Sequence, residues 1–234
     1  MGEVIVKADN LSFGYEKRLV INNIRFEIEK KDYIGIVGTN GSAKSTLLKL
    51  IMGFLKPNVG MIELFGSHIG DFKDWNKIGY LPQNARSFNT RFPATVEEIV
   101  GSSQYSQMNI LKILNKKIKE ATLAALEAVN MVGFKDSLIG NLSGGQQQRV
   151  FLAKLLVNNP EIIFMDEPLI GVDAESQDVF FDLINKLNVD FGITIVVVTH
   201  DVSKLNHRAN KIFHLDNGKL NIDNIFNKNR GEEH

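Results

Sequence analysis

A glycine-containing segment that ends in Lys-Ser-Thr is the clearest candidate for chemistry in this sequence. It reads Gly38-Thr39-Asn40-Gly41-Ser42-Ala43-Lys44-Ser45-Thr46 and lies between an expected strand at 33–37 and an expected helix at 47–54. A strand, a glycine turn and a helix start are what a phosphate-binding loop requires. In such a loop, backbone N–H groups approach phosphate oxygens, Lys44 can reach the outer phosphates and Ser45 can ligate Mg²⁺.

The loop departs from the strict phosphate-loop pattern at one position. G-x-x-x-x-G-K-[ST] asks for glycine before the lysine, and this chain has Ala43. The methyl group costs about 1–2 kcal/mol if the position needs a positive φ. Taken alone, the segment could also be an ordinary strand-to-helix turn, although Lys-Ser-Thr adds little to a purely structural turn.

Two adjacent carboxylates end a second apolar run, at residues 162–165. Asp166 would hold the magnesium shell, and Glu167, pointing the other way along the strand, would orient and deprotonate an attacking water. An acidic helix cap is the alternative for this pair alone. Its combination with the glycine loop favours the chemical interpretation.

A third segment precedes another expected helix and reads Leu142-Ser143-Gly144-Gly145-Gln146. Ser143 can cap the helix, and the two glycines make a close-fitting anion site at its positive end. A capped helix without a ligand is the alternative for this segment alone. The three segments together, in this order, are far more specific than any one of them.

The elements between these segments predict an α/β fold. β-branched runs at 33–37, 162–165 and 193–199 are typical of strands buried on both faces of a parallel sheet. Apolar residues between 179 and 187 line one face of a helix that would cover such a sheet. Strands that alternate with helices indicate an α/β protein.

Two further regions have their own patterns. Residues 87–159 show helical periodicity without a convincing strand, which predicts a helical subdomain. Within it, the lysines between 112 and 119 are interpreted as a solvated helix face. Near the end of the chain, Asn217-Gly218 between two apolar runs predicts a type I′ hairpin.

Composition narrows the classes of protein. The 234 residues are 44% hydrophobic, as in an ordinary globular protein, and carry 27 basic and 27 acidic side chains. This balance argues against a nucleic-acid partner. With no cysteine, disulfides and thiolate metal sites are excluded, and the five histidines form no close ligand pair for a structural zinc site. The apolar runs are too short to cross a bilayer, and the N-terminal residues lack a signal-peptide core, so we expect any membrane role to come through another chain.

The combined motifs resemble the nucleotide-binding subunit of an ATP-binding-cassette (ABC) transporter along essentially the whole chain. Residues 38–46 resemble the Walker A loop of that family, 162–166 its Walker B strand and 142–146 its signature. The resemblance implies an α/β P-loop NTPase fold of the ABC ATPase type, with a mostly parallel core sheet, an antiparallel β portion and a helical subdomain. It also implies one ABC ATPase domain over 1–234, with a RecA-like core at about 1–86 and 160–234 and a helical subdomain at about 87–159.

The same resemblance assigns roles to four positions outside the three segments. Tyr15 looks like the aromatic that stacks on adenine, although a core or edge-strand tyrosine is the alternative. Gln83 resembles the glutamine that touches Mg²⁺ and the attacking water and links to the membrane subunit. Asp173, in Gly-Val-Asp, resembles the D-loop aspartate of the dimer contact, and His200 the switch histidine on the γ-phosphate.

The resemblance therefore implies a complete set of site residues. Catalytic roles fall to Glu167, His200 and Gln83, and Mg²⁺ ligation to Ser45, Gln83 and Asp166. The signature that acts in trans is Leu142, Ser143, Gly144, Gly145 and Gln146. Nucleotide-binding residues are Tyr15, Gly38, Asn40, Gly41, Ser42, Ala43, Lys44, Ser45 and Thr46.

Cofactors, partners and cargo follow from the family as well. ATP and Mg²⁺ are the implied cofactors, and a homodimer is implied because the family buries each ATP between the loop of one protomer and the signature of the other. An integral membrane permease would hold the chain on the cytoplasmic face of the cell membrane, with an extracellular metal-binding protein as an indirect partner and no nucleic acid.

Residues 87–98 and 171–173 resemble bacterial metal-uptake ATPases, most of all zinc importers, and Ala43 resembles the loop of a subset of Gram-positive zinc-uptake ATPases. Manganese, iron or an iron chelate are the alternative cargoes. A soluble ABC ATPase scaffold, such as one in iron–sulfur cluster assembly, is the alternative function. The DNA-repair members of the family are excluded, because they need a long coiled-coil insertion that this chain lacks.

Overall fold

The computed structural model describes residues 2–16, 18–83, 85, 93–107, 116–205 and 207–225. The chain divides into two compact units, Met1–Trp75 with Asn188–His234, and Asn76–Leu187. Expectations about residues 86–92, Lys112 and the terminal 227–234 lie outside the described residues. The division into a RecA-like core and a helical subdomain stays a prediction.

The first unit contains an antiparallel sheet with strand order β2-β1-β4-β5. Its strands are β1 (Val4–Tyr15), β2 (Arg18–Glu29), β4 (Val59–Leu64) and β5 (Ser67–His68). Burial alternates along β2, where Ile24, Phe26 and Ile28 are buried and the residues between them are exposed. This alternation is that of a sheet with one face on the core. The sheet supplies the antiparallel portion that the family resemblance implies.

A second set of strands in the same unit contains β3 (Tyr33–Val37), the strand that leads into the phosphate loop. The others are β8 (Thr194–Val198), β9 (Lys211–Asp216) and the antiparallel edge strand β10 (Lys219–Asn224). β3 lies between β8 and β9 and is parallel to both, with Gly35 opposite Val197 and Ile212. Every residue of β3 and β8 is buried, as their β-branched composition predicted. The expected strands at 33–37 and 193–199 are confirmed.

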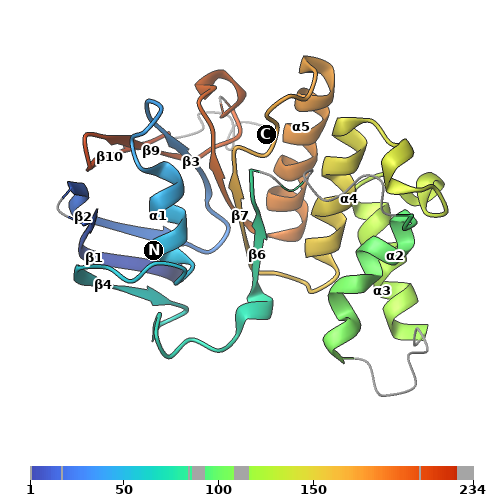
Figure 1. Cartoon of the computed structure of the whole chain (residues 1–234), viewed down its shortest axis with the longest axis horizontal. Coiled ribbons are helices and arrows are strands. Elements are labelled where there is room, and N and C mark those ends of the chain that lie inside the picture. The colour runs from blue at the N-terminus through green and yellow to red at the C-terminus, as the bar shows by residue number, and fades with distance from the viewer. Residues whose placement is uncertain are drawn as a thin grey trace, which may run out of the picture. The chain divides into compact units, whose positions relative to one another are not determined.

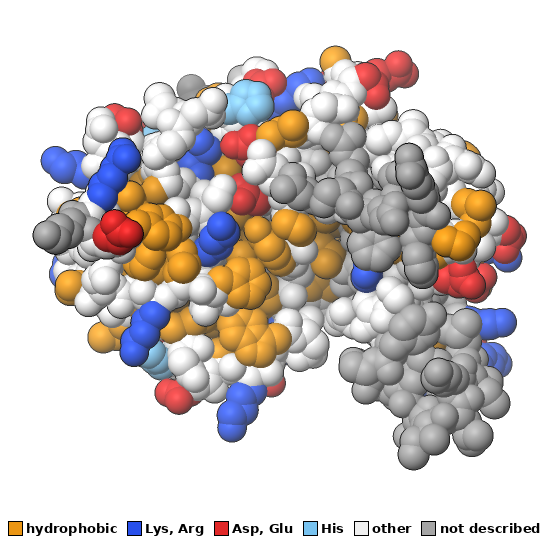
Figure 2. Space-filling model, viewed as in Figure 1, with side chains coloured by type: hydrophobic (Ala, Val, Ile, Leu, Met, Phe, Trp, Pro, Cys, Tyr) orange, Lys and Arg blue, Asp and Glu red, His pale blue; other side chains and the backbone are white. Residues whose placement is uncertain are grey.

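Helix α1 (Lys44–Ile51) follows β3 and the loop. It begins earlier than the expected 47–54 and ends three residues sooner. The early end has a local cause, because Gly53 adopts φ 71° and Phe54 N donates to Lys49 O at 2.8 Å. A left-handed glycine with such a bond closes a helix. Figure 2 shows hydrophobic side chains gathered over the part of this unit that holds α1 and β4.

The strand pair β9–β10 is joined by Asn217 and Gly218. Their φ angles are 46° and 76°. Two successive positive φ values define the type I′ turn, so the hairpin prediction is confirmed. The turn also contacts β2, because Asn22 N donates to Gly218 O at 2.8 Å.

The second unit pairs two parallel strands and carries most of the helices. The strands are β6 (Ile78–Leu81) and β7 (Ile162–Asp166), with Tyr80 opposite Phe164. The helices are α2 (Val96–Gly101), α3 (Lys116–Ala128), α4 (Gly144–Leu156) and α5 (Ala174–Phe191), which runs on past residue 187 into the first unit. Figure 1 shows α2, α3 and α4 packed side by side, and the three contact one another.

Local sequence explains how these helices begin and what they cover. Thr95 caps α2 in a capping box, with its hydroxyl accepting from Glu98 N at 3.2 Å and Glu98 Oε2 accepting from Thr95 N at 2.8 Å. On α3, Ile118 and Leu126 are buried, while Lys116, Lys117 and Lys119 are exposed. For these three lysines, a solvated helix face is confirmed.

Short 3-10 helices complete the described chain. They are η1 (Trp75–Lys77), η3 (Ser102–Gln107), η4 (Val132–Phe134), η5 (Ile139–Asn141) and η6 (Val202–Leu205). Within the described ranges, no helix combines the length and apolar character needed to cross a membrane.

Candidate nucleotide site

The phosphate loop needs glycine at two positions for two different reasons. A Cβ on Gly38 would collide with the carbonyl oxygen of Leu215 and lie 2.6 Å from Ser42 Oγ, so crowding excludes a side chain. Gly41 instead faces open space, but its φ of 82° is one that L residues rarely adopt. The backbone is therefore free to approach a ligand at Gly41 and is tightly anchored at Gly38.

Ala43 adopts the left-handed backbone conformation. The sequence could give the cost of its methyl group only on the condition that this position has a positive φ. Its φ is 72° and its ψ is 22°, directly before α1. A non-glycine residue in this region carries a strain of about 1–2 kcal/mol. Its carbonyl still accepts from Leu47 N at 2.9 Å, so the helix starts normally. The loop thus keeps the glycine-type backbone without the glycine.

Lys44 and Ser42 are arranged for an anion. Lys44 is only 5% exposed, and its ammonium donates to the carbonyl oxygens of Gly38 and Thr39 at 2.9 and 3.0 Å. An ammonium has three donors, so one is left to point at a ligand. Ser42 is buried, and its Oγ has no hydrogen-bond partner in the described part of the chain. A buried hydroxyl without a partner costs roughly 1–3 kcal/mol, which a phosphate oxygen could recover. The loop fits a phosphate group.

Tyr15 lies beside the end of this loop. Its hydroxyl is 3.4 Å from Thr46 Oγ1, and its ring meets Phe13 edge to face with centroids 5.0 Å apart. The side chain is 49% exposed, so it is not a core tyrosine. A half-exposed ring next to a phosphate loop leaves room for a planar base.

The two acidic residues end β7 in different conformations. Asp166 is the last residue of the strand and is 4% exposed. Glu167 has left the strand with φ 45°, so strand alternation does not set its direction as the sequence had suggested. Left-handed backbone at a non-glycine residue is strained, and such strain gathers at functional sites.

Asp166 also affects a neighbour on β6. Burial, and then the negative charge of Asp166, raise the pKa of the Tyr80 phenol above its ordinary value. Gln83 follows two residues after β6 and is exposed.

The signature segment forms the start of α4. Ser143 Oγ accepts from Gln146 N at 3.3 Å, and Gln146 Oε1 accepts from Ser143 N at 2.9 Å. This reciprocal pair is a capping box, which the Ser-x-x-Gln spacing could have predicted. The box supplies hydrogen-bond partners to the backbone N–H groups of Ser143 and Gln146 at this end of the helix.

Gly145 places α4 against the start of α5. A Cβ on Gly145 would lie 2.7 Å from Ser176 Cβ, so only glycine permits this approach. Asp173 caps the same end of α5 by accepting from Ser176 N at 2.9 Å. The backbone and then the side-chain hydrogen bond from Ser176 lower the pKa of the Asp173 carboxyl. Ser176 was not among the predicted site residues, although an aspartate before a helix is a capping signal.

The predicted site residues fall into two groups by unit. The first unit contains the phosphate loop, Tyr15 and His200, which follows two residues after β8 and is exposed. Gln83, Asp166, Glu167, the signature and Asp173 belong to the second. The structure brings residues together within each group, namely Tyr15 with Thr46 and Gly145 with the cap of α5.

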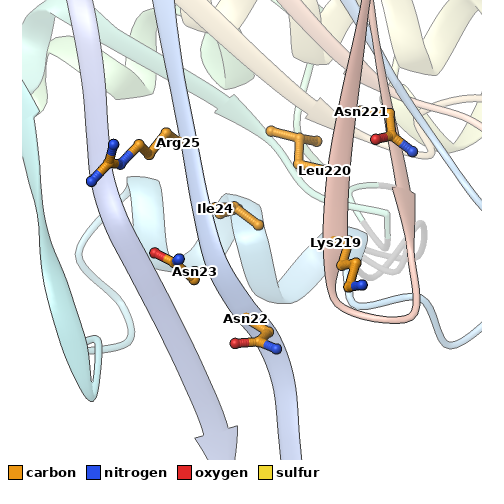
Figure 3. Close-up of a pocket in the computed structure, with 7 residues that line it drawn as sticks. All are labelled: Asn22, Asn23, Ile24, Arg25, Lys219, Leu220 and Asn221. Carbon is orange, nitrogen blue, oxygen red and sulfur yellow. The ribbon is translucent and has the colours of Figure 1, made fainter.

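An open polar hollow lies elsewhere, between β2 and β10 (Figure 3). Its volume is about 650 Å³, and its lining is Asn22, Asn23, Ile24, Arg25, Lys219, Leu220 and Asn221. None of the predicted site residues lines it. Among the described residues, no group of three His, Cys, Asp or Glu side chains could hold a metal ion.

Known proteins resemble this chain over most of its length. The sequence model of the ABC transporter family matches residues 21–170. The zinc uptake system ATP-binding protein ZurA of Listeria innocua is 44% identical over 212 residues, which cover 91% of this chain and 82% of that protein. The manganese transport system ATP-binding protein MntB of Halalkalibacterium halodurans is 37% identical over 91% of this chain and 83% of its own length.

A solved structure agrees in fold. The dimeric structure of MJ0796, a bacterial ABC transporter cassette, superposes with a TM-score of 0.77 at 27% identity, covering 94% of this chain and 98% of that one. The α/β P-loop fold of the ABC ATPase type is thereby confirmed. The chain belongs to the ABC transporter family.

Proposed function

We propose that this chain is the ATP-hydrolysing subunit of an importer that takes up a divalent metal ion, with zinc as the favoured cargo. The observation that carries the ATPase part is the preformed loop, in which the ammonium of Lys44 and the unpartnered hydroxyl of Ser42 are already buried together with left-handed backbone at Gly41 and Ala43. Groups that are already placed around the phosphate position need little reorganisation when a triphosphate binds.

The donor set for magnesium fits a hard cation. Ser45 offers a hydroxyl, Gln83 an amide oxygen and Asp166 a carboxylate, and Mg²⁺ prefers such oxygen ligands. Bound there, the ion would neutralise charge on the outer phosphates. Burial of Asp166 at the tip of β7 gives its carboxylate a defined position for this task.

The remaining chemistry belongs to side chains of the protein. Lys44 donates to the outer phosphate oxygens, and His200 contacts the γ-phosphate. Glu167 orients a water for in-line attack and accepts its proton. Tyr15 stacks on the adenine ring. Each of these roles is one that the nature of the side chain allows at its place in the fold.

A second copy of the chain completes the site. Ser143 is exposed at the capped N-terminus of α4, and with the backbone of Gly145 it would form an anion-binding end that in the dimer faces the ATP held by the other copy. ATP binding then closes the dimer and hydrolysis releases it. The dimeric MJ0796 structure supports a cassette that pairs in this way.

A permease and a membrane position follow from the same proposal. The chain would dock on the cytoplasmic face of an integral membrane permease through the surface around Gln83 and the helices α2 to α4. An extracellular metal-binding protein would deliver the ion to that permease. Zinc is favoured by the 44% identity to ZurA, and manganese is the second candidate because of MntB. The tests below also separate two other possibilities, which are iron or an iron chelate as the cargo and a soluble scaffold as the function.

The ATPase part is tested with Glu167→Gln. Removing the proton acceptor should leave nucleotide binding unchanged and slow turnover by about 100-fold or more. Glu161→Gln is the matched control, because Glu161 precedes the same strand and pairs with Lys77 at 3.4 Å. Wild-type turnover in Glu167→Gln would contradict the assigned role.

The transport part is tested by co-purification and uptake. The tagged chain should carry a polytopic membrane protein with it, and cells that depend on this chain should lose uptake of radioactive zinc when Glu167→Gln replaces it. Loss of manganese or iron uptake instead would change the cargo. Absence of any membrane partner would favour a scaffold.

A further inference from the structure

One buried leucine, Leu205, packs the segment that follows His200 against β3. Leu205 ends the short helix η6 and is fully buried. A Cβ built on Gly35 would collide with Leu205 Cδ1 and would lie 3.0 Å from Ile212 Cδ1. The Leu205 side chain therefore occupies the space that a side chain at position 35 would need, and we call this space the Gly35 slot. The slot lies in the strand that runs, three residues later, into Gly38 of the phosphate loop.

Hydrogen bonds hold both ends of the segment on that strand. Thr199 N donates to Ile36 O at 3.2 Å just before His200. After Leu205, the chain returns to the same strand, because Asn210 N donates to Tyr33 O at 2.9 Å. His200 therefore projects from a loop whose two ends are fixed on β3.

A compact turn connects His200 to the short helix that ends at Leu205. Asp201 N donates to Thr199 Oγ1 at 3.1 Å, and Asp201 Oδ1 accepts from Ser203 N at 3.0 Å. On the other side of Leu205, Ala209 N donates to Leu205 O at 3.0 Å. The turn at Asp201 and the short helix η6 thus make up the whole connection between His200 and Leu205, with four residues between the two.

We propose that Leu205 is a positioning residue for ATP hydrolysis, which acts by seating the His200 segment in the Gly35 slot and so fixes the imidazole relative to the phosphate loop. This inference rests on the proposed role of His200. Misplacing a reacting group by about 1 Å can lower the rate about 100-fold, so a contact that fixes the position of His200 can change the rate of hydrolysis.

The test compares leucines of equal burial in the full-length protein. Leu64 on β4 is also fully buried, and Leu64→Ala is the matched control for Leu205→Ala. Both variants are measured for kcat and KM with MgATP, for nucleotide affinity with a fluorescent ATP analogue, and for folded content by circular dichroism. We expect Leu205→Ala to lower kcat by about 10- to 100-fold with KM and affinity within about threefold, and Leu64→Ala to keep kcat within about threefold.

Two more variants make the result specific. Leu205→Met conserves volume and should restore kcat to within about threefold of the wild type. In a His200→Ala background, Leu205→Ala should lower the residual rate no further, because a residue that acts through His200 has nothing left to position. If Leu205→Ala does not fold, Leu205→Val against Leu64→Val carries the same comparison.

Equal losses of kcat in the Leu205 and Leu64 variants, an unchanged kcat in Leu205→Ala, or an additive loss in the double variant would each overturn the inference. His200→Ala separates it from the proposed function. Wild-type kcat in His200→Ala would refute the role of the histidine itself, whereas loss there with no loss in Leu205→Ala would refute the seat alone.

Discussion

Ala43→Gly should make the protein more stable, although glycine replaces alanine at the start of a helix. The native φ of 72° costs alanine about 1–2 kcal/mol that glycine does not pay. Glycine in turn loses about 0.4–1 kcal/mol through the greater freedom of its unfolded chain. The difference is a net gain of about 1 kcal/mol. For a chain of 234 residues, this gain corresponds to a rise in Tm of about 2–4 °C.

Thermal and urea unfolding of the nucleotide-free protein measure this gain. Ala124→Gly is the matched control, because Ala124 is an exposed residue inside α3, where the same chemical change should cost about 1 kcal/mol. The two substitutions should therefore shift Tm in opposite directions. A fall in Tm for Ala43→Gly, similar to that for Ala124→Gly, would refute the argument from backbone strain.

Nucleotide affinity gives a second, independent check. If the left-handed conformation is already present without a ligand, its strain is the same in the free and bound states and cancels from the binding free energy. MgATP affinity in Ala43→Gly should then stay within about threefold of the wild type. A tenfold gain would mean that the loop adopts this conformation only on binding.

Three other substitutions test separate contacts. Gly145→Ala should lower ATPase activity and retain nucleotide affinity, because the new methyl group displaces α4 from Ser176. The double variant Gly145→Ala with Ser176→Gly should recover activity, and a lack of recovery would contradict the proposed clash. Tyr15→Ala should weaken ATP binding by about 10- to 100-fold through lost stacking, while Tyr15→Phe stays within about threefold; equal effects in a binding titration would refute stacking. The pKa of the Asp201 carboxyl is lowered, first by the Ser203 side chain, so its stabilising effect is present above the ordinary aspartate pKa of about 3.9 and is lost as pH falls through the lower folded value. Asp201→Asn should therefore destabilise at pH 7 and lose that difference towards pH 3 in urea unfolding, and a difference that grows in acid would have the wrong sign.

The sequence predicted the parts of the fold that have a strong local pattern. β3, β7 and β8 are short runs rich in β-branched and apolar residues and buried along their whole length, and such runs admit few alternatives. The I′ hairpin was set by Asn217-Gly218, because both residues tolerate positive φ. The end of α1 was missed, since the effect of Gly53 depends on a backbone bond that periodicity does not reveal.

The sequence predicted which segments form the site, but not the backbone conformation and the packing contacts of individual residues. Phosphate-loop residues were found from their spacing, yet the strain at Ala43 could be stated only as a condition until its φ was known. The Gly35 slot was not predicted, because Leu205 lies 170 positions further along the chain and nothing local links the two. Contacts of this kind depend on how strands and loops pack, so residue types at one position do not specify them.

The beginning of α4 and the beginning of α5 touch where Gly145 meets Ser176. Because of this contact, we expect a rotation that brings Ser143 toward another copy's nucleotide to move Asp173 as well. In the proposed dimer, the signature and the D-loop would then reach the interface together. A substitution that weakens the contact of Gly145 with Ser176 would let the two segments move separately, while each keeps its own structure.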